Sequence, residues 1–110
     1  MGYEEIREII EQYSKRVREH YRPKMIIIYG SYARGTATDN SDIDIAVICD
    51  PMPGDYLENA AGLFRLRRDI DLRIEPVLIE SENTETGFYN EILTKGKVVY
   101  SAPPDRSIVL

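Results

Sequence analysis

Two aspartates separated by one residue, Asp42 and Asp44, are the strongest chemical feature of this sequence. They belong to the segment Asp42-Ile43-Asp44-Ile45-Ala46-Val47, whose composition predicts a strand. Because side chains alternate along a strand, the two carboxylates should share one face, roughly 7 Å apart. Two neighbouring carboxylates oppose each other's ionisation, and a divalent cation removes that penalty. With oxygen ligands and no nearby His or Cys, the expected cation is Mg²⁺ or Mn²⁺.

A glycine–serine pair lies upstream of these aspartates, directly after the apolar run Met25–Tyr29. Gly30 has no Cβ, so a ligand can approach the backbone closely there. Ser31 would place a hydroxyl and an amide at the start of a short helical turn, where free N–H groups attract phosphate. Arg34, one turn later, could neutralise phosphate charge, and a surface salt bridge is an equal alternative. A phosphate cradle followed by a carboxylate pair indicates a site for a nucleoside triphosphate.

Gly30-Ser31, ten intervening residues and then Asp42-Ile43-Asp44 resembles the signature of the polymerase-β-like nucleotidyltransferase superfamily. With 110 residues, the chain resembles the minimal nucleotidyltransferases, the antitoxin-type proteins encoded beside a HEPN-domain partner in prokaryotic toxin–antitoxin pairs. The resemblance implies an α/β (α+β) palm, a small mixed sheet of about four strands with helices mainly on one face. It also implies transfer of a nucleoside monophosphate, AMP from ATP, to a hydroxyl acceptor such as a tyrosine of the partner, with release of pyrophosphate.

In the superfamily a neighbouring strand supplies a third carboxylate to the metal site. Here Ile70–Ile79 is the expected strand, and Glu75 in its apolar part is the first candidate, where the family more often has Asp. Asp71 is the second candidate, on the same face but about 13 Å away by strand rise. By the resemblance, Asp42 and Asp44 hold two metal ions with Glu75, which orients or deprotonates the acceptor. The glycine–serine pair grips the β- and γ-phosphates.

The remaining elements follow from hydrophobic periodicity and breaker residues. They predict a single domain over residues 1–100 and a flexible tail over residues 101–110. The predicted elements are a helix over Tyr3–Tyr21, a helix over Asp55–Arg68, a short helix over Asn83–Leu93 and a closing strand over Lys97–Tyr100.

Composition narrows the function classes. Fourteen basic and nineteen acidic residues give a net charge of −5, which argues against non-specific binding to nucleic acid. Cys49 is the only cysteine, so no internal disulfide can form and a reducing cytoplasm is expected. The sequence has no long apolar span, so no membrane role is expected.

Two other functions are compatible with the same motifs. The first is a non-catalytic, antitoxin-like interaction protein that keeps the fold and uses its acidic cleft or helices to neutralise a partner. The second is a nucleotidyltransferase acting on a small antibiotic-like hydroxyl compound. Larger members of the superfamily bind the base and the acceptor with additional domains. A partner protein or a second copy of this chain is therefore expected to supply the part of the binding site that these domains form.

Overall fold

The computed structural model describes residues 3–81 and 87–103, and these contain one mixed sheet of four strands. The strands lie in the order β3-β2-β1-β4. β1 runs antiparallel to both β2 and β4, whereas β3 runs parallel to β2. The strands are β1 (Pro23–Tyr29), β2 (Ile43–Cys49), β3 (Ile74–Glu80) and β4 (Lys97–Ser101).

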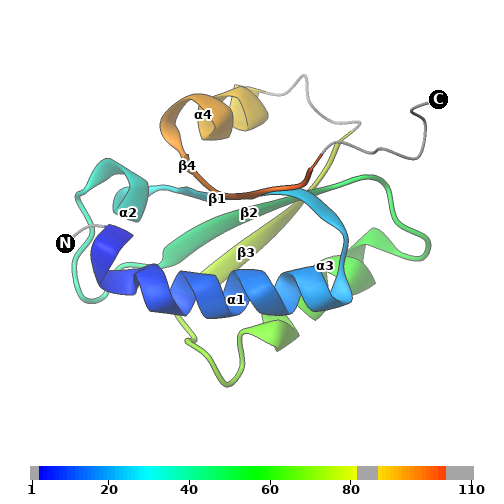
Figure 1. Cartoon of the computed structure of the whole chain (residues 1–110), viewed down its shortest axis with the longest axis horizontal. Coiled ribbons are helices and arrows are strands. Elements are labelled where there is room, and N and C mark those ends of the chain that lie inside the picture. The colour runs from blue at the N-terminus through cyan, green and yellow to red at the C-terminus, as the bar shows by residue number, and fades with distance from the viewer. Residues whose placement is uncertain (1–2, 82–86, 104–110) are drawn as a thin grey trace.

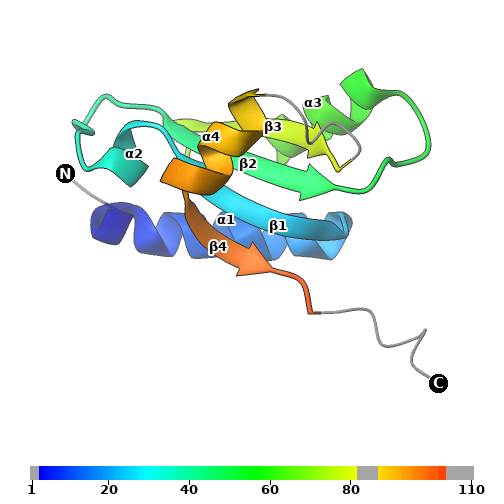
Figure 2. The same ribbon diagram turned by 90° about the horizontal axis from the view of Figure 1, so that it is seen from above.

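Helices cover both faces of the sheet, two of them on one face (Figure 1). The α1 helix (Arg7–His20), which continues a 3₁₀ turn at Tyr3–Ile6, lies on this face with α3 (Tyr56–Leu66). The α4 helix (Gly87–Lys95) lies on the opposite face, so that the sheet separates it from α1 (Figure 2). The short α2 helix (Ser31–Arg34) follows β1 directly at one end of the sheet.

The central strand β2 is apolar on both faces, as expected for a strand covered on both sides. Ile43, Ile45 and Val47 pack into the core beneath α1 and α3, and all three are buried. Ala46 packs into the smaller core beneath α4. By alternation Asp44, which is half-buried, points to the α4 face as well. A carboxylate therefore interrupts an apolar strand at the end of the sheet where β1 gives way to α2.

The α1 and α3 helices are joined by tyrosine hydroxyls as well as by apolar packing. The hydroxyl of the fully buried Tyr13 donates a hydrogen bond to the carbonyl of Leu63 at 2.7 Å. The Tyr21 hydroxyl donates to the carbonyl of Asn59, also at 2.7 Å. Tyr13 and Tyr21, which share the apolar stripe of the helix predicted over Tyr3–Tyr21, thus serve core packing.

The third strand begins later than the sequence pattern predicts, at Ile74 instead of Ile70. The carboxylate of Asp71 accepts a hydrogen bond from the Arg73 backbone N–H at 2.9 Å, which is an Asx-type turn that competes with a strand. Leu72, which would face the core if the strand began at Ile70, is 66% exposed for this reason. Pro76 lacks an N–H and so favours either an edge or a bulge, and it lies in an edge strand with continuous register against β2.

The predicted fold class is confirmed: a mixed sheet of four strands in the described residues, with helices on it. Cys49 at the end of β2 is buried, as expected for a small apolar side chain. Asn83 and Thr84 are the expected caps of the helix predicted over Asn83–Leu93. They lie outside the described residues, as does most of the predicted tail, residues 104–110. None of the described helices is long and apolar enough to cross a membrane.

Candidate active site

Asp44 lies between two neighbours on adjacent strands. It is paired with Glu75 in the parallel β2–β3 ladder and with Tyr29 in the antiparallel β1–β2 ladder. Residues paired across a ladder point to the same face of the sheet, so both side chains lie beside the Asp44 carboxylate. The register therefore brings Glu75, the first candidate for the third carboxylate, beside Asp44.

The bend after β1 lies directly against Asp44. Gly30 has φ 74° and ψ −152°, a backbone conformation that residues with a side chain rarely adopt. A Cβ added to Gly30 would collide with Oδ2 of Asp44. Gly30 also starts the α2 turn, where its carbonyl accepts the Arg34 N–H at 3.0 Å, and Ser31 is the first residue of that turn. The sequence therefore folds the glycine–serine bend and the second aspartate into contact.

Electrostatics at this point disfavour an ionised Asp44. Burial raises the pKa of Asp44, the nearby Asp42 and Glu75 carboxylates raise it further, and the Arg34 guanidinium lowers it. Burial, with Asp44 and Glu75 nearby, also raises the pKa of Tyr29 to about 12. These effects place Asp42, Asp44, Glu75 and Arg34 in one electrostatic neighbourhood.

A cavity of about 260 Å³ opens between this strand end and α4. The Asp44 carboxylate forms part of its wall, so a ligand in the cavity would touch the acidic group directly. Its lining comprises Tyr29, Gly30, Arg34 and Asp44 from the sheet side and Phe88, Glu91, Ile92 and Lys95 from α4.

The α4 half of this cavity was not part of the predicted site. Apolar periodicity places Phe88 on the inward face of the helix predicted over Asn83–Leu93. Phe88 is instead 46% exposed, and its ring meets Tyr29 edge-on, with centroids 5.6 Å apart. Lys95 at the last turn of α4 pairs with Glu91 at 3.4 Å. Apolar periodicity indicated a helix here. It does not specify which sheet face a helix covers, so nothing in the sequence brought Lys95 to the glycine–serine bend.

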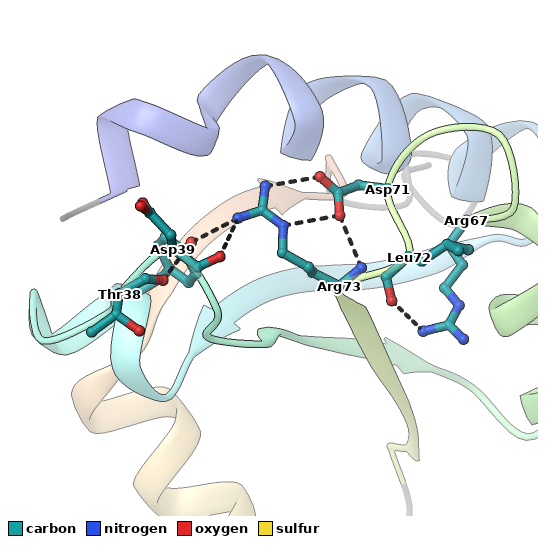
Figure 3. A network of polar contacts seen from close by, with 7 residues as sticks. Thr38, Asp39, Arg67, Asp71, Leu72 and Arg73 are labelled. Atoms are coloured by element: carbon teal, nitrogen blue, oxygen red, sulfur yellow. Dashed lines mark hydrogen bonds and ion pairs between the residues drawn. The ribbon is translucent and has the colours of Figure 1, made fainter.

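The two candidates for the third carboxylate are in different surroundings. Asp71, which precedes β3 and is not part of it, forms a two-pronged ion pair with Arg73 (Figure 3). Glu75 is a half-exposed residue of β3 whose carboxylate lies 3.7 Å from Nη1 of Arg67. The register therefore favours Glu75 over Asp71 as the neighbour of Asp44.

The carboxylates near Asp44 offer oxygen ligands to a divalent cation. Carboxylate oxygens are the ligands that Mg²⁺ and Mn²⁺ prefer, and the mutual repulsion of Asp42 and Asp44 is relieved by a cation. Within residues 3–81 and 87–103, no three His, Cys, Asp or Glu side chains lie close enough to form a metal cluster. The aspartate pair thus fits the cation, while Glu75 lies beside the pair without completing a three-ligand set.

A second, larger cavity of about 540 Å³ lies at the other end of β1. Its lining includes three cationic side chains, Arg18, Arg22 and Lys24, and no carboxylate. Such a lining could attract anions but offers no ligand to a divalent cation. The smaller cavity beside Asp44 is therefore the candidate for metal-dependent chemistry.

The small mixed sheet, with Asp44 of the aspartate pair against a glycine–serine bend, is the architecture of a nucleotidyltransferase palm. The family model described as "Polymerase beta, Nucleotidyltransferase" matches residues 4–105 of the chain. The chain belongs to this family.

The chain is also similar to several archaeal proteins. A Methanocaldococcus jannaschii protein named "Putative protein adenylyltransferase" is 44% identical over 67 residues, covering 54% of this chain and 78% of the relative. A second protein of that name from the same organism is 30% identical over 95 residues, covering 83% of this chain and 94% of the relative. "Protein adenylyltransferase MntA" of Thermococcus cleftensis is 37% identical over 68 residues, covering 54% and 69%.

The fold has a solved counterpart. The crystal structure of a "putative nucleotidyltransferase" from Sulfolobus solfataricus superimposes with a TM-score of 0.64 at 16% identity, covering 86% of this chain and 78% of that chain. This likeness concerns the fold. The expectation of the nucleotidyltransferase fold is confirmed by it and by the family match.

Proposed function

We propose that this protein transfers AMP from ATP to a hydroxyl group of a protein, a tyrosine of a HEPN-type partner in a toxin–antitoxin pair. The observation that carries the proposal is the contact of Gly30 with Asp44 at the wall of a cavity that also contains Arg34 and Lys95. Relatives named protein adenylyltransferase support AMP as the transferred group and a protein as the acceptor. The partner class comes from the resemblance to minimal nucleotidyltransferases.

Asp42 and Asp44 would hold Mg²⁺ or Mn²⁺, which when bound neutralises phosphate charge and favours the attacking alkoxide. In the ion-free protein the same pair repels, and this repulsion contributes to the raised pKa of Asp44. The pair is therefore better suited to binding a cation than to acting as a solvated surface.

The bend and the basic side chains would bind the triphosphate. Gly30 leaves room for the β- and γ-phosphates next to the backbone, and Ser31 offers a hydroxyl and an amide at the start of α2. Arg34 from α2 and Lys95 from α4 line the same cavity and would neutralise phosphate charge. Phe88 and Ile92 supply apolar surface against which the ribose or the base can pack.

Glu75 would orient the acceptor hydroxyl and take its proton. The acceptor oxygen forms a bond to the α-phosphorus, the bond between that phosphorus and the bridging oxygen to the β-phosphate breaks, and pyrophosphate leaves. The proton released from the acceptor goes to the Glu75 carboxylate. Its position opposite Asp44 in the β2–β3 ladder supports this role.

The proposal is tested by incubating the protein with Mg²⁺, ATP labelled at the α-phosphate and a HEPN-domain protein from the same organism. The expected result is covalent label on a tyrosine of the partner, absent with the Asp42→Asn/Asp44→Asn double variant. Partner neutralisation that survives the double substitution, without any label transfer, would instead favour the non-catalytic interaction protein. Label on the chain's own tyrosines would show transfer but remove the assigned acceptor.

A further inference from the structure

Arg73, the residue just before β3, lies at the centre of a polar network that none of the catalytic roles above uses (Figure 3). Its guanidinium binds both oxygens of Asp71, with Nε–Oδ1 at 3.1 Å and Nη2–Oδ2 at 2.9 Å. This pairing lowers the pKa of Asp71. The two-pronged geometry fixes the plane of the guanidinium and directs its remaining nitrogen, Nη1, away from Asp71.

Nη1 of Arg73 reaches the loop that connects α2 to β2. It donates to the hydroxyl of the buried Tyr32 at 3.2 Å and to the backbone carbonyl of Asp39 at 3.5 Å. The Tyr32 hydroxyl in turn donates to the carbonyl of Thr38 at 3.5 Å. One guanidinium thus connects the start of β3 with the α2 turn and with the loop before Asp42.

Arg73 also holds the other side of Asp42. Its backbone carbonyl accepts a hydrogen bond from the N–H of Ile43, at the start of β2, at 2.8 Å. Asp42 itself is exposed and lies between Asp39 and Ile43, whose backbone groups Arg73 binds on either side of it. The backbone around Asp42 is therefore held on both sides by one residue that directly precedes β3.

We propose that Arg73 is a positioning residue for Asp42, holding the 38–42 segment so that the Asp42 carboxylate faces the cation site beside Asp44. The cation part of this statement rests on the proposed function, whereas the ordering of the segment does not. A lysine cannot replace Arg73, because its single ammonium group does not offer the forked donors that bind Asp71 and the loop together.

The test compares the parent protein with Arg73→Gln, Arg73→Lys and Tyr32→Phe. Arg16→Gln is the matched control, since Arg16 binds Asp69 and the Leu66 carbonyl near the same turn without contacting the 38–42 segment. The first readout is hydrogen exchange of the backbone amides in residues 38–43 of the free protein. The second is Mn²⁺ affinity by electron paramagnetic resonance, without nucleotide or acceptor.

Amide exchange in residues 38–43 should be about tenfold faster in both Arg73 variants, as expected for losing a charged hydrogen bond, with a smaller increase in Tyr32→Phe. Mn²⁺ affinity should fall roughly tenfold, the usual cost of removing an outer-shell partner. Exchange equal to that of Arg16→Gln, or faster exchange with unchanged Mn²⁺ affinity, would overturn the proposal. A parent protein that binds no Mn²⁺ would contradict the proposed function, and the exchange comparison would still decide whether Arg73 orders the segment.

Discussion

Gly30 and Asp44 are fourteen positions apart in the chain, yet the backbone of Gly30 lies against the carboxylate of Asp44. A cavity lined by α4 residues lies on one side of this contact, and Glu75 of β3 is paired with Asp44 on the other. The absence of a side chain at Gly30 is therefore as important to the site as the acidic pair itself.

Gly30→Ala should impair transfer strongly and also lower the stability of the protein. The added methyl would collide with Asp44 Oδ2, and the backbone at φ 74° disfavours any side chain by about 1–3 kcal/mol. The measurements are the rate of label transfer and the free energy of unfolding in urea.

The matched control for that substitution is Gly35→Ala. Gly35 has nearly the same φ, 77°, but no atom within 4 Å of an added Cβ. It should lose about 1 kcal/mol of stability from backbone strain and keep the carboxylate in place. Equal losses of transfer in the two variants would show that strain, not the contact with Asp44, explains the effect.

Single neutralisation of the acidic residues should separate their roles. Asp42→Asn and Asp44→Asn should each reduce the rate of transfer by at least about 100-fold, because each removes a cation ligand. Glu75→Gln removes the proposed proton acceptor and should lower kcat with little change in KM for ATP. Asp50→Asn, an exposed acid beyond the other end of β2, is the control and should be near the parent. A Glu75→Gln variant with full kcat would remove Glu75 from the chemistry.

Asp44→Asn should stabilise the protein at pH 7 while it inactivates it. The pKa of Asp44 is raised in the folded state, mainly by burial and then by Asp42 and Glu75, so its ionised form weakens folding. Because Asp44 is partly exposed and screened by solvent, the gain should stay below about 1 kcal/mol. The gain should shrink as the pH falls through the raised pKa of Asp44, and it should be lost well below the ordinary pKa of about 4, where the carboxyl is protonated in both states. Urea unfolding at pH 7 and pH 3 measures this, and an equal gain at both values would contradict it.

Asp71→Asn should have the opposite effect on stability at pH 7. The Arg73 side chain lowers the pKa of Asp71 in the folded state, so the ionised carboxyl adds stability above its ordinary pKa. The variant should be less stable than the parent at pH 7, and the difference should fade as the pH falls through the lowered pKa. The same pair of urea titrations checks this prediction, which fails if Asp71→Asn is stabilising at pH 7.

Neutralising either of the two basic residues that line the cavity beside Asp44 should weaken ATP binding. Arg34→Gln and Lys95→Gln should each raise KM for ATP roughly tenfold, the effect expected for a lost charge-assisted hydrogen bond, with smaller changes in kcat. Lys97→Gln is the control, because Lys97 is two residues further on and stacks over the Tyr3 ring outside this cavity. A KM that rises equally in the control would indicate a general charge effect.

The sequence could predict the residues that are close along the chain or fixed by strand alternation. Gly30, Ser31 and Arg34 occupy one short turn, and Asp42 and Asp44 bracket the start of one strand, so local geometry suffices for them. Glu75 was placed from its apolar setting, and the parallel register with β2 agrees with that placement.

The remainder of the site depends on tertiary packing. Lys95 and Phe88 reach the cavity only because α4 lies on the opposite sheet face from α1 and α3, which apolar periodicity does not encode. Asp71 was placed on a strand because its neighbours alternate, but its own carboxylate closes a turn with Arg73 and delays the strand.

The most direct test is a crystal structure of the protein with Mg²⁺ and an ATP analogue that has a methylene bridge between the α- and β-phosphates. The account predicts the triphosphate between the Gly30-Ser31 bend and the Asp42–Asp44 pair, with a cation bound by both aspartates. A nucleotide seated instead in the basic cavity of Arg18, Arg22 and Lys24, with the aspartates free of metal, would contradict it.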